Sequence, residues 1–142
     1  VLRHAAPHTT SRQLYKGALD GASRGVFQGN IYVAEGADGT DGQMTNRTVL
    51  LSDKCEMDSK PQLEIYADDV KCAHGATVGE LDEDALFYLR ARGVPERQAR
   101  ELLVEGFVAE AFDSLDQPAI VDLLRGRIAT WLNAAIAAKE AA

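Results

Sequence analysis

Glycine divides this chain into two regions, residues 1–80 and residues 81–142, with different hydrophobic patterns. Ten of the 12 glycines fall before residue 94, where short segments of β-favouring residues alternate with polar or glycine-containing turns. The segments predicted as strands are Leu14–Leu19, Gly25–Gln28, Asn30–Ala34, Thr45–Leu51, Leu63–Tyr66, Asp69–His74 and Ala76–Glu80. Glu35–Gln43, with three glycines and three acidic residues, is predicted as a loop. No helical pattern separates these strands, which favours an all-β unit such as a sandwich, a barrel or a β-solenoid.

The second region follows a helical period. Asp82 is predicted to cap a first helix that ends at Gly93, which suits the left-handed conformation of a helix terminus. A second helix is predicted from Pro95 to about Leu115, and a third from Pro118. The apolar positions of the last two helices are Ala99, Leu102, Leu103, Phe107 and Ala111, then Ile120, Leu123, Leu124, Ile128, Trp131, Leu132, Ala135 and Ile136. We therefore expect a β core segment followed by a helical C-terminal domain.

The composition excludes two classes of function. Lys and Arg total 15 against 22 Asp and Glu, for a net charge of -7, so the chain lacks the positive charge that nucleic-acid binding requires. No apolar stretch approaches the ~20 residues of a membrane-spanning helix. Two cysteines are too few for a disulfide framework, which predicts a soluble cytoplasmic chain with free thiols. The opening Val-Leu-Arg-His has neither Met nor a long apolar leader, so we expect a fragment truncated at its N-terminus.

The segment Asp68–Thr77 holds the densest group of reactive side chains. In a strand, Cys72 and His74 lie on one face, where a thiolate and an imidazole could bind a soft metal or an iron–sulfur cluster. Gly75 leaves room for another chain or a ligand to approach. The alternative is that Cys72 belongs to the core, because a metal site of four ligands is not visible nearby in the sequence. Both interpretations stay open at this point.

Enzyme signatures are missing from the sequence. The serines lie in no G-x-S-x-G setting, and the chain has neither a Walker-type phosphate loop nor a dinucleotide fingerprint after a strand. The acidic run Asp82-Glu83-Asp84 fits the start of a helix, where the dipole favours negative charge. His4 and His8 are four residues apart, but Pro7 lies between them, so we expect surface or strand residues rather than a metal pair.

Several segments resemble a known family. The run Leu63–Gly79, which contains Cys72, His74 and Gly75, resembles a signature of the SufB/SufD family, the scaffold subunits of the SUF iron–sulfur cluster assembly system. Further matching segments are Leu86–Val94, His8–Arg12, Lys16–Gly17 through Phe27–Gly29, and Thr40–Gln43. The resemblance covers nearly the whole chain and corresponds to the C-terminal part of a subunit. Gly75 stands where the SufB branch tends to have Glu, so the chain is similar to the SufD branch.

The resemblance implies a mainly β fold with an α tail: a right-handed parallel β-helix segment followed by a small helical C-terminal domain. It implies a scaffold without catalytic activity, in which clusters are built and passed to apo-proteins. The implied partners are a SufB-like paralogue, in a heterodimer, and a SufC-like ATPase, which would contact helices within residues 82–142 and supply the ATPase activity. By motif position His74 is the candidate cluster-assembly or metal residue, and Cys72 a second candidate. The iron–sulfur cluster would be transient and shared with the partner, with none held tightly by this chain.

Two alternatives remain. The first is a non-catalytic β-rich interaction module without a cluster role, which forms a homodimer through an edge strand. The second is a carbohydrate-active enzyme with a β-helix fold. Such an enzyme needs clustered carboxylates and aromatic platforms for sugars, and the aromatic content of 6% argues against it.

Overall fold

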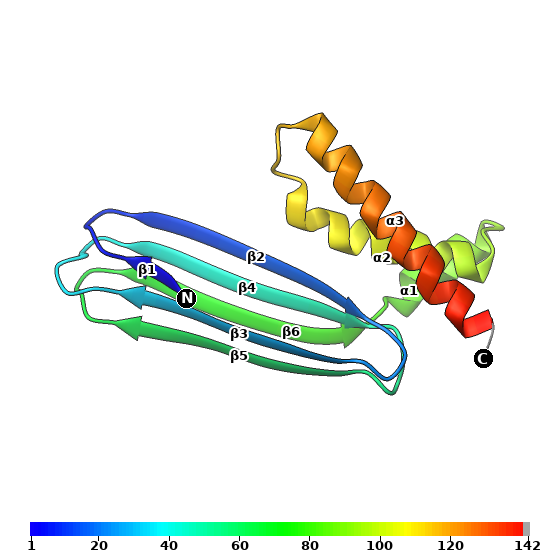
Figure 1. The fold of residues 1–142 in the computed structure, drawn as a ribbon, viewed down its shortest axis with the longest axis horizontal. Helices are drawn as coiled ribbons and strands as arrows, with labels where there is room; N and C mark the ends of the chain where they lie inside the picture. The colour runs from blue at the N-terminus through cyan, green and yellow to red at the C-terminus, as the bar shows by residue number, and fades with distance from the viewer. Residues whose placement is uncertain (141–142) are drawn as a thin grey trace.

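The computed structural model describes residues 1–140, with side chains through Ala135; residues 141–142 and the predicted core side chain of Ile136 lie outside the described part. Six strands precede three helices (Figure 1). The strands are β1 Leu2–His4, β2 Thr10–Leu19, β3 Arg24–Val33, β4 Asp41–Leu50, β5 Glu56–Ile65 and β6 Lys71–Glu80. The helices are α1 Glu83–Ala91, α2 Glu96–Ala109 and α3 Pro118–Glu140, with a single 3-10 turn, η1 Glu110–Phe112, after α2.

Successive strands alternate between two parallel sheets. One sheet has the order β1-β3-β5 and the other β2-β4-β6, and every neighbouring pair is parallel. The two sheets face each other as two layers in which the chain runs in opposite directions (Figure 1). Thr10 pairs with Asp41 and Asp41 with Lys71, so equivalent positions recur about every 30 residues, a period in structure that the sequence does not reveal by repetition.

The expected mainly β fold with a right-handed parallel β-helix is wrong. The structure has two separate three-stranded parallel sheets and three helices, which is an α/β architecture. The seven short predicted strands also need correction, because β3 continues through Gly29 and β6 through Gly75. Glycines that resemble breaks in the sequence lie inside ten-residue strands, where the ladder of backbone hydrogen bonds continues past them. Long strands of this kind build two extended sheets with free edges.

Alternate residues of each strand point into the space between the sheets. The core there consists of Ile31, Val33, Ala37 and Met44, all at most 1% exposed. Gly29 lies in the same layer, and a Cβ on it would overlap Met44 Sδ and lie 2.8 Å from Phe27 Cζ. Glycine at this position is therefore required by the close approach of the core side chains.

The helices pack against the other face of the sheet β2-β4-β6. Asp82 caps α1 as predicted, since its carboxylate accepts a hydrogen bond of 3.0 Å from the Ala85 backbone N–H. The second predicted helix is too long, because α2 gives way to η1 and a turn before Leu115. A second core, formed by Val49, Leu81, Val104 and Leu132, joins the helices to the strands. Within the described residues, the helices are too short or too polar to cross a membrane.

Alanine substitutions at two strand glycines, Gly29 and Gly79, test this packing. Replacing Gly29 by alanine is expected to destabilise the protein by about 1–3 kcal/mol, because the added methyl group overpacks a filled layer. Gly79→Ala is the control: a Cβ on this strand glycine meets nothing within 4 Å, so its effect is expected to stay within about 0.5 kcal/mol. Denaturant unfolding of both variants measures the difference. Equal destabilisation would contradict the tight interior assigned to Gly29.

Candidate functional site

Strand β6 places Cys72 and His74 at an open edge of its sheet. The Lys71 backbone N–H donates to the Thr40 carbonyl at 2.8 Å, which fixes the odd-numbered residues of β6 as those bonded to β4. In a parallel ladder the intervening residues point their backbone groups to the opposite side. The even-numbered residues, Cys72 and His74 among them, therefore direct their N–H and C=O groups to the open edge, where no strand of the described chain pairs with them.

The same two side chains point toward the interior between the sheets. Cys72 lies in register with Gly42 and His74 with the fully buried Met44. Cys72 is half-buried against the core, and a Cβ on Gly42 would lie 3.4 Å from its Sγ. His74 is exposed, because β6 is the last strand and nothing of the described chain covers it. A histidine thus occupies a core position at an uncovered end of the core.

Strand β5, the outer strand of the facing sheet, has a different edge. The Glu56 backbone N–H donates to the Ser23 carbonyl, just before β3, at 3.0 Å, and the Tyr66 N–H, just after β5, donates to the Val33 carbonyl of β3 at 2.9 Å. The even-numbered residues of β5 therefore bond to β3, and the odd-numbered residues turn their backbone groups to the open side. Pro61 is one of these residues and has no N–H to offer. The edge of β5 is therefore interrupted in its middle, whereas the edge of β6 contains no proline and is continuous.

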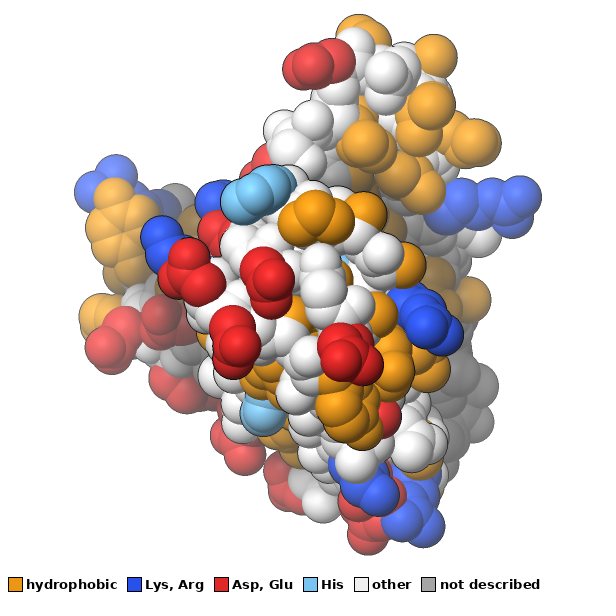
Figure 2. Space-filling view, turned by 90° about the vertical axis from the view of Figure 1, so that its left-hand side faces the viewer, with side chains coloured by type: hydrophobic (Ala, Val, Ile, Leu, Met, Phe, Trp, Pro, Cys, Tyr) orange, Lys and Arg blue, Asp and Glu red, His pale blue; other side chains and the backbone are white. Residues whose placement is uncertain are grey.

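Exposed apolar side chains lie along the open side of the molecule formed by β5 and β6. Val78, near the end of β6, and Ile65, at the end of β5, lie at opposite ends of the sheets; both face the interior yet remain 45% and 40% exposed. Tyr66, next to Ile65 in the chain, is 59% exposed. Seen along the strands, the end of the molecule at which β3 and β5 finish shows apolar side chains among acidic ones (Figure 2). An open strand edge together with exposed core residues is a surface that another chain can cover.

The described part of the chain brings no third metal ligand to Cys72 and His74. Among the described side chains, no group of three or more His, Cys, Asp or Glu is arranged to hold a metal ion. His4 lies in β1 and is buried, with its ring nitrogens bonded to the hydroxyls of Thr9 at 2.6 Å and Ser11 at 2.9 Å. His8 lies in the exposed turn that follows, as expected for a surface residue. Within the described part of the chain, Cys72 and His74 can therefore contribute two ligands at most.

Two features of the surface escaped sequence reasoning. The role of Pro61 depends on which side of β5 it faces, and only the strand register shows this. Phe87 and Tyr88 of α1 are 73% and 57% exposed beside the buried Leu86. The helical period around Leu86 indicates that its two neighbours point away from the core, so this signal was present in the sequence.

Comparison with known proteins identifies the family to which the chain belongs. Residues 1–107 match the family model of the SUF system FeS cluster assembly, SufBD core domain. The chain therefore belongs to the SufB/SufD family, and its similarity to SufD makes it a SufD-like member. It is 46% identical over 127 residues to the iron-sulfur cluster assembly protein SufD of Escherichia coli K12, a match of 89% of this chain and 30% of that protein.

Two other relatives are similar to this chain over most of its length. A SufBD family protein of Synechocystis sp. PCC 6803 is 40% identical over 84% of this chain and 26% of its own length. The chloroplastic protein ABCI7 of Arabidopsis thaliana is 38% identical over 90% of this chain and 27% of its own length. The chain spans under one third of the length of each of these relatives.

The two thiols provide a test of the site geometry. We expect Cys72 to react with a thiol reagent in the folded protein, because its side chain is half-buried at an open edge. Cys55 is 7% exposed, with its Sγ 3.6 Å from the Gly21 carbonyl oxygen, and is expected to react only after unfolding. Mass spectrometry of labelled peptides assigns the two rates, and Cys72→Ser should remove the fast one. Equal rates at both thiols would contradict this placement of β6.

Proposed function

We propose that the chain is part of a scaffold subunit for iron–sulfur cluster assembly, in a SufB–SufD–SufC type complex that builds clusters and passes them to apo-proteins. The observation that carries this proposal is His74, an exposed imidazole in a core position on a continuous strand edge. Membership in the SufB/SufD family supports the same role. The subunit is proposed to act without catalysis of its own, with ATP hydrolysis confined to the partner.

The donor atoms support a shared cluster rather than a resident one. A neutral imidazole binds iron well, and a thiolate binds it more strongly. His74 is accessible for this role, and the half-buried Cys72 two residues away is the second candidate. Since these residues supply too few ligands, the cluster is proposed to be transient cargo completed by ligands of the partner subunit.

A SufB-like paralogue is the proposed occupant of the β6 edge. Strand β6 offers an unbroken row of backbone donors and acceptors, and the apolar Val78 and Ile65 next to it would be buried by the partner. Such pairing would bring the partner's side chains next to His74. A homodimer of this chain through the same edge is the alternative occupant. The net charge of -7 argues against nucleic acid, and the cytoplasmic location stays a prediction.

The ATPase is proposed to bind the helices within residues 82–142. Helix α1 exposes the two aromatic side chains Phe87 and Tyr88, while its Leu86 is buried. Large exposed aromatic side chains are typical anchors of protein interfaces. These two residues are therefore the proposed contact.

An interaction module without a cluster role is the competing function. The open edge of β6 supports it equally, because an edge strand pairs with a partner whatever the chemistry of its side chains. The two functions differ in one respect: only the scaffold needs the imidazole of His74.

Replacement of His74 distinguishes the scaffold function from the interaction module. In the full-length subunit, co-expressed anaerobically with its SufB-like and SufC-like partners, His74→Ala is expected to weaken iron retention at least about tenfold through loss of a ligand. Iron and sulfide per complex are measured after purification. Because the proposed pairing uses the backbone groups of β6, which the substitution leaves in place, assembly of the complex should be unchanged.

The control for this experiment is His8→Asn. His8 is also exposed but lies in a turn with a positive φ of 57°, which asparagine tolerates. This variant should keep the full iron and sulfide content. Normal content in the His74→Ala complex would reject the cluster role and leave the interaction module.

Replacement of Phe87 tests the ATPase contact. Phe87→Ser is expected to weaken binding of the SufC-like ATPase by about 30-fold, the cost of losing an interface anchor worth ~2 kcal/mol. Leu123→Ser on α3, also strongly exposed at 63%, is the matched control and should bind normally. Titration of the purified subunit with the ATPase measures both. Loss of binding only in the Leu123 variant would contradict the proposed contact at α1 and indicate that the ATPase binds α3.

A further inference from the structure

The helices are attached to the strands at two separated places. The chain passes from β6 to α1 through Leu81, and this is the covalent link. The main contacts between helices and strands are made by α2 and η1 against β2, which is the opposite edge of the same sheet from β6. Helix α2 starts beside the strand ends and runs back over β2 (Figure 1). The far end of α2 is therefore remote from the covalent link.

A carboxylate holds that far end in place. Glu110, directly after α2, pairs with Lys16 of β2 and, at 3.0 Å, with Arg47 of β4. The Lys16 side chain is only 1% exposed, and its ammonium lies 4.0 Å from the centre of the Phe107 ring. The hydrogen bond from Lys16 lowers the pKa of Glu110 below its ordinary value, so the carboxylate is charged at neutral pH. A buried ammonium depends on such a counter-charge.

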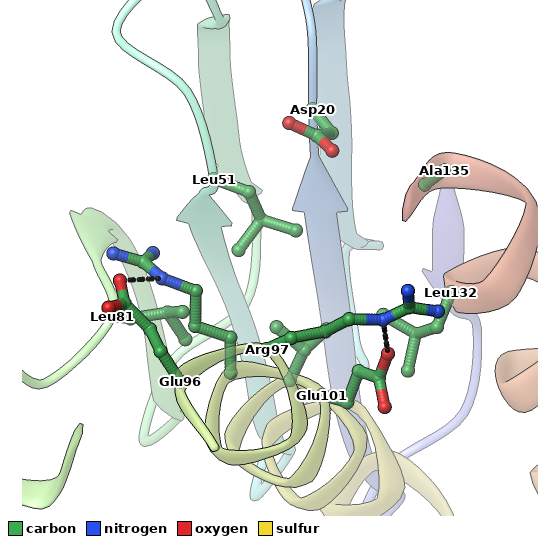
Figure 3. Close-up of a pocket in the computed structure, with 10 residues that line it drawn as sticks. Asp20, Leu51, Leu81, Glu96, Arg97, Glu101, Leu132 and Ala135 are labelled. Carbon is green, nitrogen blue, oxygen red and sulfur yellow. Dashed lines mark hydrogen bonds and ion pairs between the residues drawn. The ribbon is translucent and has the colours of Figure 1, made fainter. Parts of the chain in front are cut away.

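Grooves open to solvent line the rest of this junction. A pocket of about 410 Å³ lies between the strand ends and α2–α3, with Leu51, Leu81 and Leu132 along it and the paired Arg97 and Glu101 at its rim (Figure 3). A second pocket of about 240 Å³ separates part of β2 from α3, and a third of about 290 Å³ lies between β4, β6 and α2. Separating the helices from the sheet therefore gives up less apolar contact than a fully packed junction would.

We propose that the helical part is a hinged arm, and that Glu110 is the releasable latch which holds it against β2 and β4. On release, α2 and α3 swing away from β2 about the link at Leu81. The docked state gains the two ion pairs of Glu110 and the small core around Val104. The released state regains full hydration of Lys16 and Glu110 and widens the grooves. Neither the iron chemistry of His74 nor the identity of a partner enters this argument.

Distance measurements on the full-length protein test the latch. Nitroxide labels on genetically encoded residues at Lys60 of β5 and Asp122 of α3, both exposed, report the position of the arm. The unaltered protein is expected to give one narrow distance. Glu110→Gln keeps the shape of the side chain but removes its charge. The fraction of molecules with a longer distance between the two labels should rise about fivefold or more, the lower limit of typical coupling between two equilibria.

A matched variant and a salt titration complete the test. Glu105→Gln breaks an ion pair of 3.5 Å to Arg125 that joins α2 to α3 and does not reach the strands, so its distance distribution should match the unaltered protein. High salt should move the unaltered protein toward the Glu110→Gln distribution because it screens the latch. An unchanged distribution in both Glu110→Gln and high salt would overturn the proposal, as would equal broadening in Glu105→Gln.

Discussion

The parallel ladder between β4 and β6 is the constraint on which the candidate site depends. In such a ladder the direction of a side chain and the lateral direction of its backbone groups alternate together. The hydrogen bond from Lys71 to Thr40 therefore decides both properties for the whole strand. Cys72 and His74 point into the core and also turn their backbone groups to the open edge. A partner strand that pairs with β6 bonds to the same residues whose side chains it covers.

The position of His74 explains why a polar residue is tolerated there. One strand inward, the equivalent residue is Met44, which is 1% exposed and packed. A histidine at that depth would need partners for both ring nitrogens, as His4 has in Thr9 and Ser11. At the open end His74 is exposed to solvent and needs no such partners from the protein. In the proposed complex a partner covers the edge, so the ring needs a new bonding partner, and the proposed function supplies iron as that partner.

Local signals in the sequence predicted the helices better than the strands. Asp82 caps α1 and Pro118 begins α3 because capping and the fixed φ of proline depend on a few neighbouring residues. The fold class, which came from the family resemblance, was wrong, and the strands were predicted too short because Gly29 and Gly75 resemble turns. Cys72 and His74 were placed on one face correctly by the period of a strand. The open edge and the Lys16–Glu110 pair were beyond reach, because both depend on contacts between distant parts of the chain.

Strand β6 links the candidate site to the arm. Its first half carries His74, and its last residue leads to the hinge at Leu81. All ten residues of β6 pair with β4, so the strand cannot stretch or tilt at one end without breaking hydrogen bonds along the ladder. Movement of the helices is therefore absorbed at Leu81 while β6 keeps its shape. A coupling between the arm and His74 then requires a partner that touches both β6 and the helices, since the strand itself is too well held to transmit the motion.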